Sequence, residues 1–314
     1  MTNVEKQSFS TVAKSNAPSI LVIPLNLYGQ LIKAKQTFLL LYTAILVYLI
    51  SAWNSEFSLV NLVVLSVSLF LAISGSTLLN MYIDRDIDAV MERTKARALP
   101  SYRVHPNAVL IYGLGLTFTG VLLSGLFLNT LTMIAVFLGF FFDVVVYSLL
   151  LKRRTRYSII FGGIAGGLPA IAGRTAAIGT VDALTLLLGL FVITWIPLHI
   201  LTLATIPKNL EGYKKARVPM WPVVSGTISA NRVVTISAIA TCVVVSLAGI
   251  SLEIHVLTFI PLILFSGYLI YLSVINLSNP SDRRTFKIFK LASMFMALSF
   301  LWLYIGLILA STLP

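Results

Sequence analysis

The chain has 314 residues, of which 58% are hydrophobic and only 11% are charged. Soluble domains usually carry about 25% charged residues, so this composition excludes an ordinary soluble domain and indicates a membrane protein. The net charge of +12 would also suit a protein that binds nucleic acid, so the positions of the cations must decide between the two interpretations.

Nine segments are apolar over the roughly 20 residues that a helix needs to cross a bilayer. They are Thr37–Trp53, Leu59–Leu79, Ala108–Leu128, Leu131–Leu151, Tyr157–Ile178, Ala183–Ile206, Val233–Leu252, Val256–Leu277 and Leu291–Ala310. None alternates polar and apolar residues as barrel strands do. We therefore predict an all-α integral membrane protein, with one transmembrane domain over residues 36–314 and a preceding cytoplasmic segment over residues 1–35. This segment has no cleavable signal pattern, so we expect the first span to be retained.

Every lysine and arginine except Arg174 lies before the first span or in a loop that follows an even-numbered span. Positive charge on alternate loops indicates their cytoplasmic location. The pattern predicts a cytoplasmic N-terminus, an external C-terminus and a multi-pass protein of the cell membrane. It explains the net charge without a nucleic-acid partner. Arg174 lies near the outer end of the fifth span, where we expect it to pair with Asp182.

Three polar residues at the cytoplasmic end of the second span, Asn80, Asp84 and Asp88, are spaced by four and therefore form one stripe on a helix. Carboxylates at this spacing can share Mg²⁺, which leaves other coordination positions to phosphate oxygens. A helix leaving the membrane could simply become polar. However, Asp84, Asp86, Asp88 and Glu92 are four of only 11 acidic residues in the chain. This concentration favours a metal–diphosphate site in the polar loop over residues 84–107. A second polar loop, over residues 207–232, lies opposite it.

The same stretch resembles a known family. Residues 80–88 (Asn-Met-Tyr-Ile-Asp-Arg-Asp-Ile-Asp), followed by Met91-Glu92-Arg93-Thr94 and Arg97, resemble the first aspartate-rich motif of the heme O synthases (protoheme IX farnesyltransferases) in the UbiA prenyltransferase superfamily. Further similar blocks follow in family order: Tyr147 with residues 151–155, residues 162–169, Trp195 with Pro197 and His199, and Tyr213 with residues 219–226.

The resemblance implies a UbiA-like bundle of nine transmembrane helices that transfers a farnesyl group from farnesyl diphosphate to heme B, with water addition, to give heme O. It implies Mg²⁺ as cofactor, Asn80, Asp84 and Asp88 as catalytic residues, and Asp84 and Asp88 as metal ligands. In the second acidic motif Gly212 stands where the family has Asp. A metal on that side would therefore have to be bound by Glu211.

Cations near the stripe are candidates for binding the diphosphate, although those in the loops also suit the topology. They are Lys33, Lys35, Arg93, Arg97, Lys152 and Arg153. His199 in the sixth span and Tyr147 in the fourth are candidate heme contacts, although an intramembrane histidine can also be a hydrogen-bonded core residue. For Asp143, inside the fourth span, we expect a nearby cation or hydroxyl as partner and assign no catalytic role. For Arg174, a heme propionate is the alternative partner to Asp182.

Two alternative functions are open. One is a UbiA-type enzyme whose acceptor is a quinone precursor or a glyceryl phosphate lipid. The other is a transporter that binds heme or an isoprenoid without chemistry. Transporters place polar residues near the middle of the membrane, whereas here they concentrate at its cytoplasmic edge, which favours an enzyme. Membrane lipid is an expected partner, and heme A synthase or a terminal oxidase are candidate assembly partners.

Overall fold

The protein's structure is a computed structural model that describes residue 23 and residues 25–313, so most of the segment expected over residues 1–35 lies outside the described residues. The elements of the described part are all helical. They are α2 (Leu25–Leu31), α3 (Ala34–Ser51), η1 (Ala52–Asn54), α4 (Leu59–Val90), α5 (Pro106–Phe127), α6 (Thr130–Phe140), η2 (Phe141–Leu151), α7 (Ser158–Ile178), α8 (Ala183–Thr205), α9 (Pro207–Lys215), α10 (Trp221–Ser251), α11 (Val256–Ser278) and α12 (Asp282–Thr312).

Nine stretches of this described part are long and apolar enough to cross a membrane, with α6 and η2 joined in one span over Thr130–Leu151. The predicted all-α membrane fold and its nine spans are therefore confirmed. The largest differences from the predicted limits lie at polar ends, where α4 and α12 extend well beyond the apolar windows, and at α10, whose first residues form a separate turn before a kink at Gly226. Helices can extend in this way because polar side chains outside the hydrocarbon do not interrupt backbone hydrogen bonding.

Capping residues stand where four of the helices begin or end on one side of the bundle. Ser58 accepts a hydrogen bond from the Asn61 backbone at the start of α4, and Asn129 caps α6 in the same way. Asp182 forms a capping box at the start of α8, and Gly179 ends α7 with a φ of 69°. These side chains satisfy the free amides of the first turn, and glycine accepts the left-handed conformation that ends a helix.

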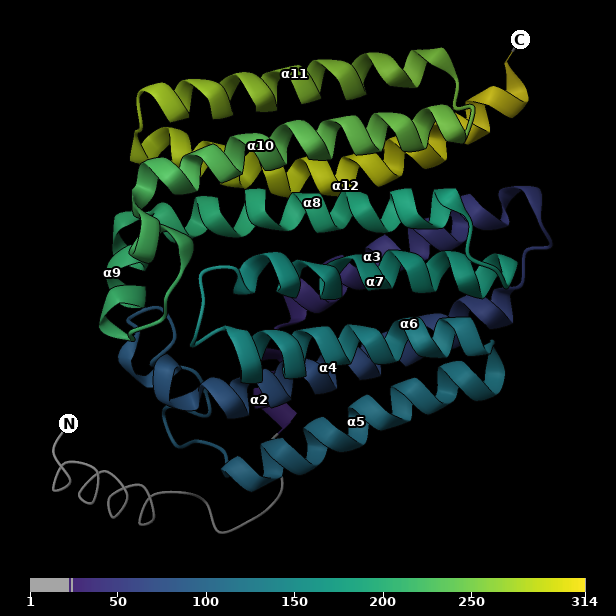
Figure 1. The fold of residues 1–314 in the computed structure, drawn as a ribbon. Coiled ribbons are helices and arrows are strands. Elements are labelled where there is room, and N and C mark those ends of the chain that lie inside the picture. The colour runs from purple at the N-terminus through teal and green to yellow at the C-terminus, as the bar shows by residue number, and fades with distance from the viewer. Residues whose placement is uncertain (1–22, 24, 314) are drawn as a thin grey trace, which may run out of the picture.

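The spans run side by side in a single bundle, with α11 at one edge and α5 at the other (Figure 1). Helix α4 packs mainly on α5, α7 packs on α3 and α8, and α8 packs on α10. Small residues permit the closest approaches. A Cβ at Gly167 would lie 2.6 Å from the Gly189 carbonyl oxygen of α8, and one at Gly173 would overlap the Ala44 carbonyl oxygen of α3.

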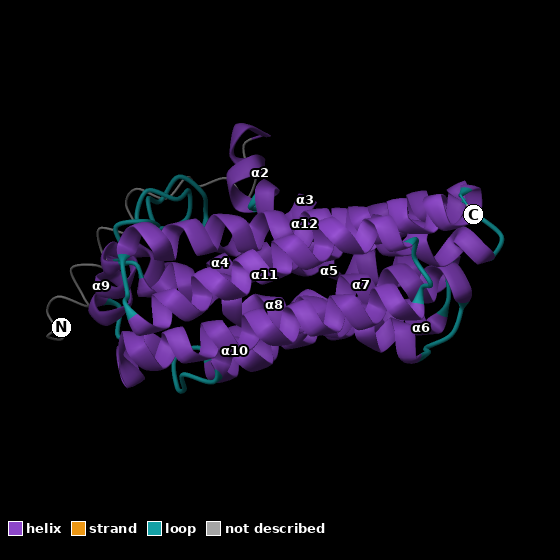
Figure 2. Ribbon diagram, turned by 90° about the horizontal axis from the view of Figure 1, so that it is seen from above, coloured by secondary structure: helices purple, strands orange, loops and turns teal. Residues whose placement is uncertain are grey.

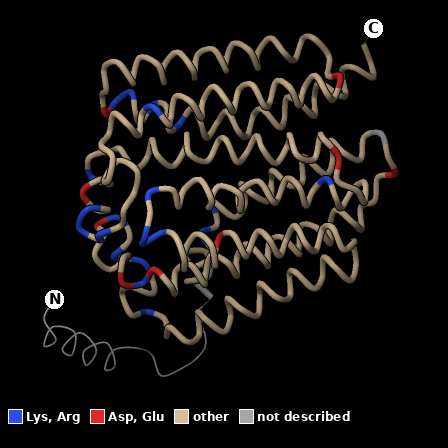
Figure 3. Tube along the Cα trace, in the orientation of Figure 1, with Lys and Arg blue, Asp and Glu red and all other residues tan. Residues whose placement is uncertain are grey.

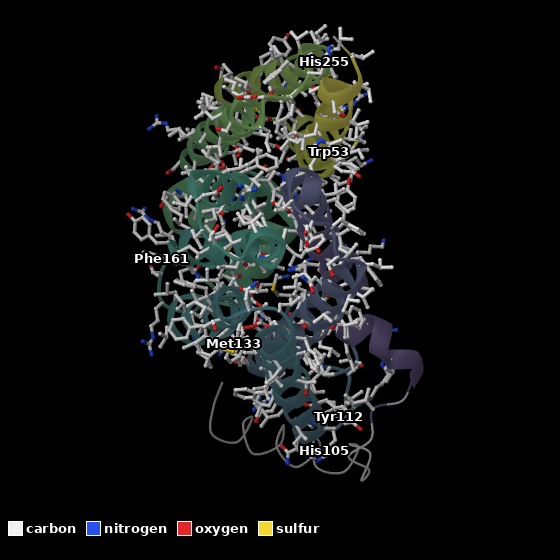
Figure 4. The ribbon with its side chains drawn as sticks, turned by 90° about the vertical axis from the view of Figure 1, so that its right-hand side faces the viewer. Trp53, His105, Tyr112, Met133, Phe161 and His255 are labelled. Carbon is white, nitrogen blue, oxygen red and sulfur yellow. The ribbon has the colours of Figure 1, made fainter. Side chains whose placement is uncertain are left out.

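Helix α9 and the C-terminus lie at opposite ends of the bundle (Figure 2). Viewed along the helices, His255 ahead of α11 and His105 ahead of α5 lie at opposite edges (Figure 4). Lysine and arginine gather at the end of the bundle that carries α9 (Figure 3). The alternation read from the sequence therefore corresponds to one charged end of the molecule. Which membrane face this end occupies stays a prediction.

Candidate functional site

Helix α4 carries the predicted stripe without a break. Asn80, Asp84 and Asp88 all lie within this helix and are 9%, 6% and 6% exposed. The helix ends at Val90, and the hydroxyl of Thr94 then donates a hydrogen bond to the Asp88 carbonyl oxygen at 2.9 Å. The chain therefore turns back over the stripe, and the predicted polar face is a buried polar cluster at the charged end of the bundle.

The neighbouring element, η2, is a π-helix of 11 residues. Beyond its last residue, the Lys152 amide donates to the Tyr147 carbonyl oxygen, five residues back, at 2.8 Å. Residues four and five apart share a face on such a helix, which has about 4.4 residues per turn. Asp143, Tyr147, Ser148 and Lys152 therefore lie on one face. An α-helix would turn Lys152 roughly 180° away from Asp143.

Three contacts join this face of η2 to the stripe on α4. The Asn80 side-chain nitrogen donates to Asp143 Oδ2 at 2.7 Å, and the Ser148 hydroxyl donates to Asn80 Oδ1 at 2.8 Å. Four residues further along both helices, the Lys152 ammonium donates to Asp84 Oδ2. The hydrogen-bond partner of Asp143 is therefore an amide, whereas the expected nearby cation, Lys33, acts on this carboxylate through its charge.

Asp84 has an oxygen that no protein donor satisfies. Its Oδ1 atom is buried and has no hydrogen-bond partner among the described residues. A buried polar atom that is left without a hydrogen-bond partner is costly. This atom is therefore the best-placed protein ligand for a cation or for a donor carried by a substrate.

Two further cations surround the stripe. Arg97 donates to Asp88 Oδ2 at 2.8 Å from the loop after α4. Lys33 stands at the start of α3 in a left-handed conformation, with a φ of 45°. Burial, together with the positive charges of Arg97 and Lys152, lowers the pKa of Lys33 to about 8, while Asp143 and Asp88 oppose this effect.

Aromatic rings line the cluster. The Lys152 ammonium lies 5.5 Å from the centroid of the Tyr147 ring, and the ring packs against Gly162, where a Cβ would lie 2.7 Å from it. Burial works against the charge of Lys152, but Tyr147, Asp84 and Tyr213 together raise its pKa above the usual value. This lysine is therefore a fixed cation at neutral pH.

Helix α9 lies beside the end of α4. A Cβ at Gly212 would lie 3.3 Å from the Met91 side chain. The hydrogen bond and charge of Lys95, with Lys208 and Lys215 of α9 contributing, lower the pKa of Glu92 at the end of α4. Glu211 on the same helix is exposed and pairs with Lys215 at 3.0 Å.

Some predicted residues lie apart from the buried cluster. Lys35 and Arg93 are exposed. Arg153 contacts Asp86 through two hydrogen bonds of 2.7 and 2.6 Å, on the exposed side of α4. No group of three His, Cys, Asp or Glu side chains in the described residues is arranged to hold a metal. The structure therefore does not bring Glu211 together with Asp84 and Asp88 as a preformed metal site, and the Glu211 side chain is 66% exposed beside Lys215.

The candidate heme residue His199 lies between two aromatic rings. Its ring stacks on Trp195 at 4.5 Å and on Phe289 of α12 at 4.6 Å. Its Nδ1 atom lies 3.3 Å from the Ser293 hydroxyl. Both faces of the imidazole are covered, so only its edge could contact a ligand. The expected outer pair of Arg174 with Asp182 is confirmed, with Nε to Oδ1 at 2.8 Å.

Sequence reasoning missed Ser148 and Tyr213 as members of the site. Tyr213 was noted only as part of a family block, and Ser148 is one hydroxyl among many in an apolar span. Proximity in sequence to Tyr147 and Lys152 was the one available signal for Ser148. It could not be used without knowing that η2 is a π-helix.

Comparison with known proteins identifies related sequences over most of the chain. Residues 40–310 match the UbiA prenyltransferase family. The chain is 46% identical over 197 residues to the protoheme IX farnesyltransferase of Hyperthermus butylicus, a match that covers 63% of this chain and 65% of that protein. It is 35% identical over 281 residues to the protoheme IX farnesyltransferase of Archaeoglobus fulgidus, covering 88% of this chain and 96% of that one.

Solved structures share the fold. A chain from work on digeranylgeranylglyceryl phosphate synthase superposes with a TM-score of 0.75 at 21% identity, covering 90% of this chain and 98% of that one. A UbiA homolog from Archaeoglobus fulgidus bound to DMAPP and Mg²⁺ superposes with a TM-score of 0.63 at 18% identity, covering 88% and 99%. At this level of identity the likeness establishes the bundle architecture alone.

Proposed function

Because this chain belongs to the UbiA prenyltransferase family, we propose that it transfers a farnesyl group from farnesyl diphosphate to a vinyl group of heme B, with addition of water, to give heme O. Relatives that carry the name protoheme IX farnesyltransferase, at up to 46% identity, favour this acceptor over a quinone precursor or a glyceryl phosphate lipid. Membership of an enzyme family also speaks against a transporter without chemistry.

The observation that carries the proposed chemistry is the buried Asp84 carboxylate, one oxygen of which has no partner. A divalent cation with open coordination positions fits such an oxygen, and Asp88 lies one turn further on the same face. Asp84 and Asp88 would hold Mg²⁺, with Asn80 beside them. The metal, when bound, supplies the charge neutralisation that a diphosphate leaving group needs. The exposed Glu211 is proposed only as a ligand of a second ion.

Lys33, Arg97 and Lys152 are proposed to bind the diphosphate from three sides. They come from the start of α3, the loop after α4 and the end of η2, and their charges interact with one another. Three cations that face the same buried carboxylates form a site for a polyanion. Lys35, Arg93 and Arg153 are proposed to attract the diphosphate to the charged end of the bundle, because they lie exposed around the cluster.

The reaction breaks the bond between C1 of the farnesyl group and the diphosphate oxygen, and the diphosphate leaves with the electron pair. The electron-rich vinyl group of heme attacks the allylic cation. Water adds to the resulting cation on the porphyrin side chain and releases a proton. The apolar bundle around the prenyl chain excludes other water until this step. We place the site on the cytoplasmic side of the cell membrane, where the positive-inside pattern supports it.

Tyr147 and His199 are the proposed heme contacts. The Tyr147 ring borders the cationic cluster, whereas His199 lies between aromatic rings of α8 and α12. The edge of the imidazole is free of aromatic cover, so a contact through a ring nitrogen is the one that suits it. Assembly with heme A synthase or a terminal oxidase is a further proposal, because these proteins would use the product.

Diphosphate release from farnesyl diphosphate tests the proposal directly. Purified protein with heme B and Mg²⁺ should release diphosphate, and Asp84→Ala should reduce the rate by about 10²-fold or more, as losses of transition-state charge stabilisation do. Asp86→Ala is the matched control, because this acid lies two residues away on the exposed side of α4 and is 62% exposed in its pair with Arg153. Equal turnover by both variants would refute the metal–diphosphate assignment.

A further inference from the structure

The amide of Asn80 is held at both of its ends by η2. Its nitrogen donates to Asp143 Oδ2 at 2.7 Å, and its oxygen accepts from the Ser148 hydroxyl at 2.8 Å. An asparagine side chain has two donor hydrogens and two acceptor lone pairs. Because Asp143 can only accept when ionised, it allows the nitrogen on its side and excludes the oxygen. The Ser148 hydroxyl can donate or accept, so by itself it does not fix the direction of the amide.

The same contacts set the register between two helices. Asn80 of α4 meets Ser148 of η2, and four residues further along both helices Asp84 meets Lys152. The contact between Asn80 and Ser148 lies deeper in the membrane span than the contact between Asp84 and Lys152. A shift or rotation of η2 where it contacts Asn80 would therefore move Lys152 away from the Asp84 carboxylate.

Asp143 takes part in these contacts between α4 and η2, but the proposed chemistry does not use it. It is partly buried inside a span, where an ionisable side chain is costly unless it has a partner. Its side chain forms one hydrogen bond among the described residues, the one to Asn80. The charge of Asp143 also acts on Lys33 across the cluster. Within the part of the chain that the structure describes, no cation forms an ion pair with Asp143, so the Asn80 amide is its direct hydrogen-bond partner.

We propose that Asp143 is a positioning residue for the diphosphate site: it fixes the direction of the Asn80 amide and thereby keeps α4 and η2 in the register that brings Asp84 against Lys152. The π-helical turn is what makes this possible, because Asp143, Ser148 and Lys152 share a face only in that geometry. The inference rests on the proposed function, since it concerns how that site is held.

A double-mutant cycle between Asp143 and Asn80 tests this inference. The readout is binding of inorganic pyrophosphate with Mg²⁺, measured by calorimetry on the detergent-purified full chain, together with KM and kcat for farnesyl diphosphate. Asp143→Ala should weaken pyrophosphate–Mg²⁺ binding by about 10- to 100-fold, the usual effect of losing a residue that orients a ligand. In an Asn80→Ala background the same substitution should have no further effect.

Conservative variants separate positioning from bulk stability. Asp143→Asn can still accept the bond from Asn80 through its carbonyl oxygen, but its own NH2 group no longer excludes the reversed Asn80 amide. It should therefore recover only part of the binding that Asp143→Ala loses. Leu150→Ala is the matched control on η2, because Leu150 is 44% exposed at the outer surface of the bundle, and it should bind as the wild type does. If Asp143→Ala cannot be purified, Asp143→Asn enters the same cycle with Asn80→Ala.

Several results would overturn the inference. One is an equal loss from Asp143→Ala in the wild-type and Asn80→Ala backgrounds. Another is a lower melting temperature for Asp143→Ala together with normal binding of pyrophosphate and Mg²⁺, which would indicate a structural role alone. Failure of the proposed function gives a different result, because the wild type and Asp84→Ala would then bind pyrophosphate equally.

Discussion

Removing the cation of the buried Lys152–Asp84 pair should destabilise the protein in a way that Mg²⁺ reverses. The two side chains are 14% and 9% exposed, and the second oxygen of Asp84 has no hydrogen-bond partner in the part of the chain that the structure describes. Lys152→Met would therefore leave a buried carboxylate with no counter-charge in direct contact. Breaking a buried pair by removing one partner costs about 3–5 kcal/mol. Since a chain of a few hundred residues loses roughly 2–4 °C per kcal/mol, the melting temperature should fall by about 6 °C or more.

The assay is thermal unfolding of the detergent-purified protein, first in EDTA and then with Mg²⁺. A cation that binds the folded state stabilises it by linkage, so Mg²⁺ should raise the melting temperature of Lys152→Met more than that of the wild type. Lys95→Met is the control, because Lys95 pairs with Glu92 at the surface, where the side chains are 53% and 60% exposed and such pairs contribute little. An unchanged melting temperature for Lys152→Met in EDTA would refute this reasoning.

Three further predictions follow from the same cluster and from the packing around it. Lys33 is a cation below its pKa of about 8 and neutral above it, so kcat/KM for farnesyl diphosphate should fall as the pH rises through that value. Lys33→Arg keeps the charge and should remove this inflection, and a wild-type profile without it would contradict the assignment. Arg97→Ala removes the partner of Asp88 and should raise KM for farnesyl diphosphate by about tenfold, or roughly 1.4 kcal/mol, whereas Arg97→Lys should recover part of the loss; an unchanged KM would exclude a contact with the diphosphate. Gly173→Ala would place a Cβ against the backbone of α3 and should cost about 1–3 kcal/mol by overpacking, while Gly115→Ala, where the space is open, should leave the melting temperature unchanged.

The spans could be predicted from sequence because a bilayer imposes a simple requirement. A helix in hydrocarbon must be apolar over a fixed length, and that length is visible in one sequence. The stripe on α4 was predictable for a similar reason, since a spacing of four residues places Asn80, Asp84 and Asp88 on one face of any α-helix. The pair of Arg174 and Asp182 followed from two isolated charges at the same end of neighbouring spans.

Lys33, Arg97 and Lys152 were candidates from the sequence, but the geometry that brings them to the stripe could not be predicted in this way. An α-helical reading of residues 141–151 places Asp143 and Lys152 on opposite faces, and only the π-helix brings both toward α4. Lys33 itself adopts a left-handed conformation at the start of α3. Composition gives no sign of this conformation, which places Lys33 at the cluster. Glu211 was expected near the metal because it neighbours the position of an acid in the family motif. Its side chain instead lies exposed and pairs with Lys215, one turn away on α9.

The central claim, farnesyl transfer to heme B, is tested most directly by the mass of the porphyrin extracted after incubation of the purified protein with heme B, farnesyl diphosphate and Mg²⁺. We expect a heme enlarged by one farnesyl group and one molecule of water, formed by the wild type and strongly reduced in Asp84→Ala. Unmodified heme alongside released diphosphate, or a farnesyl group found on another acceptor, would contradict it.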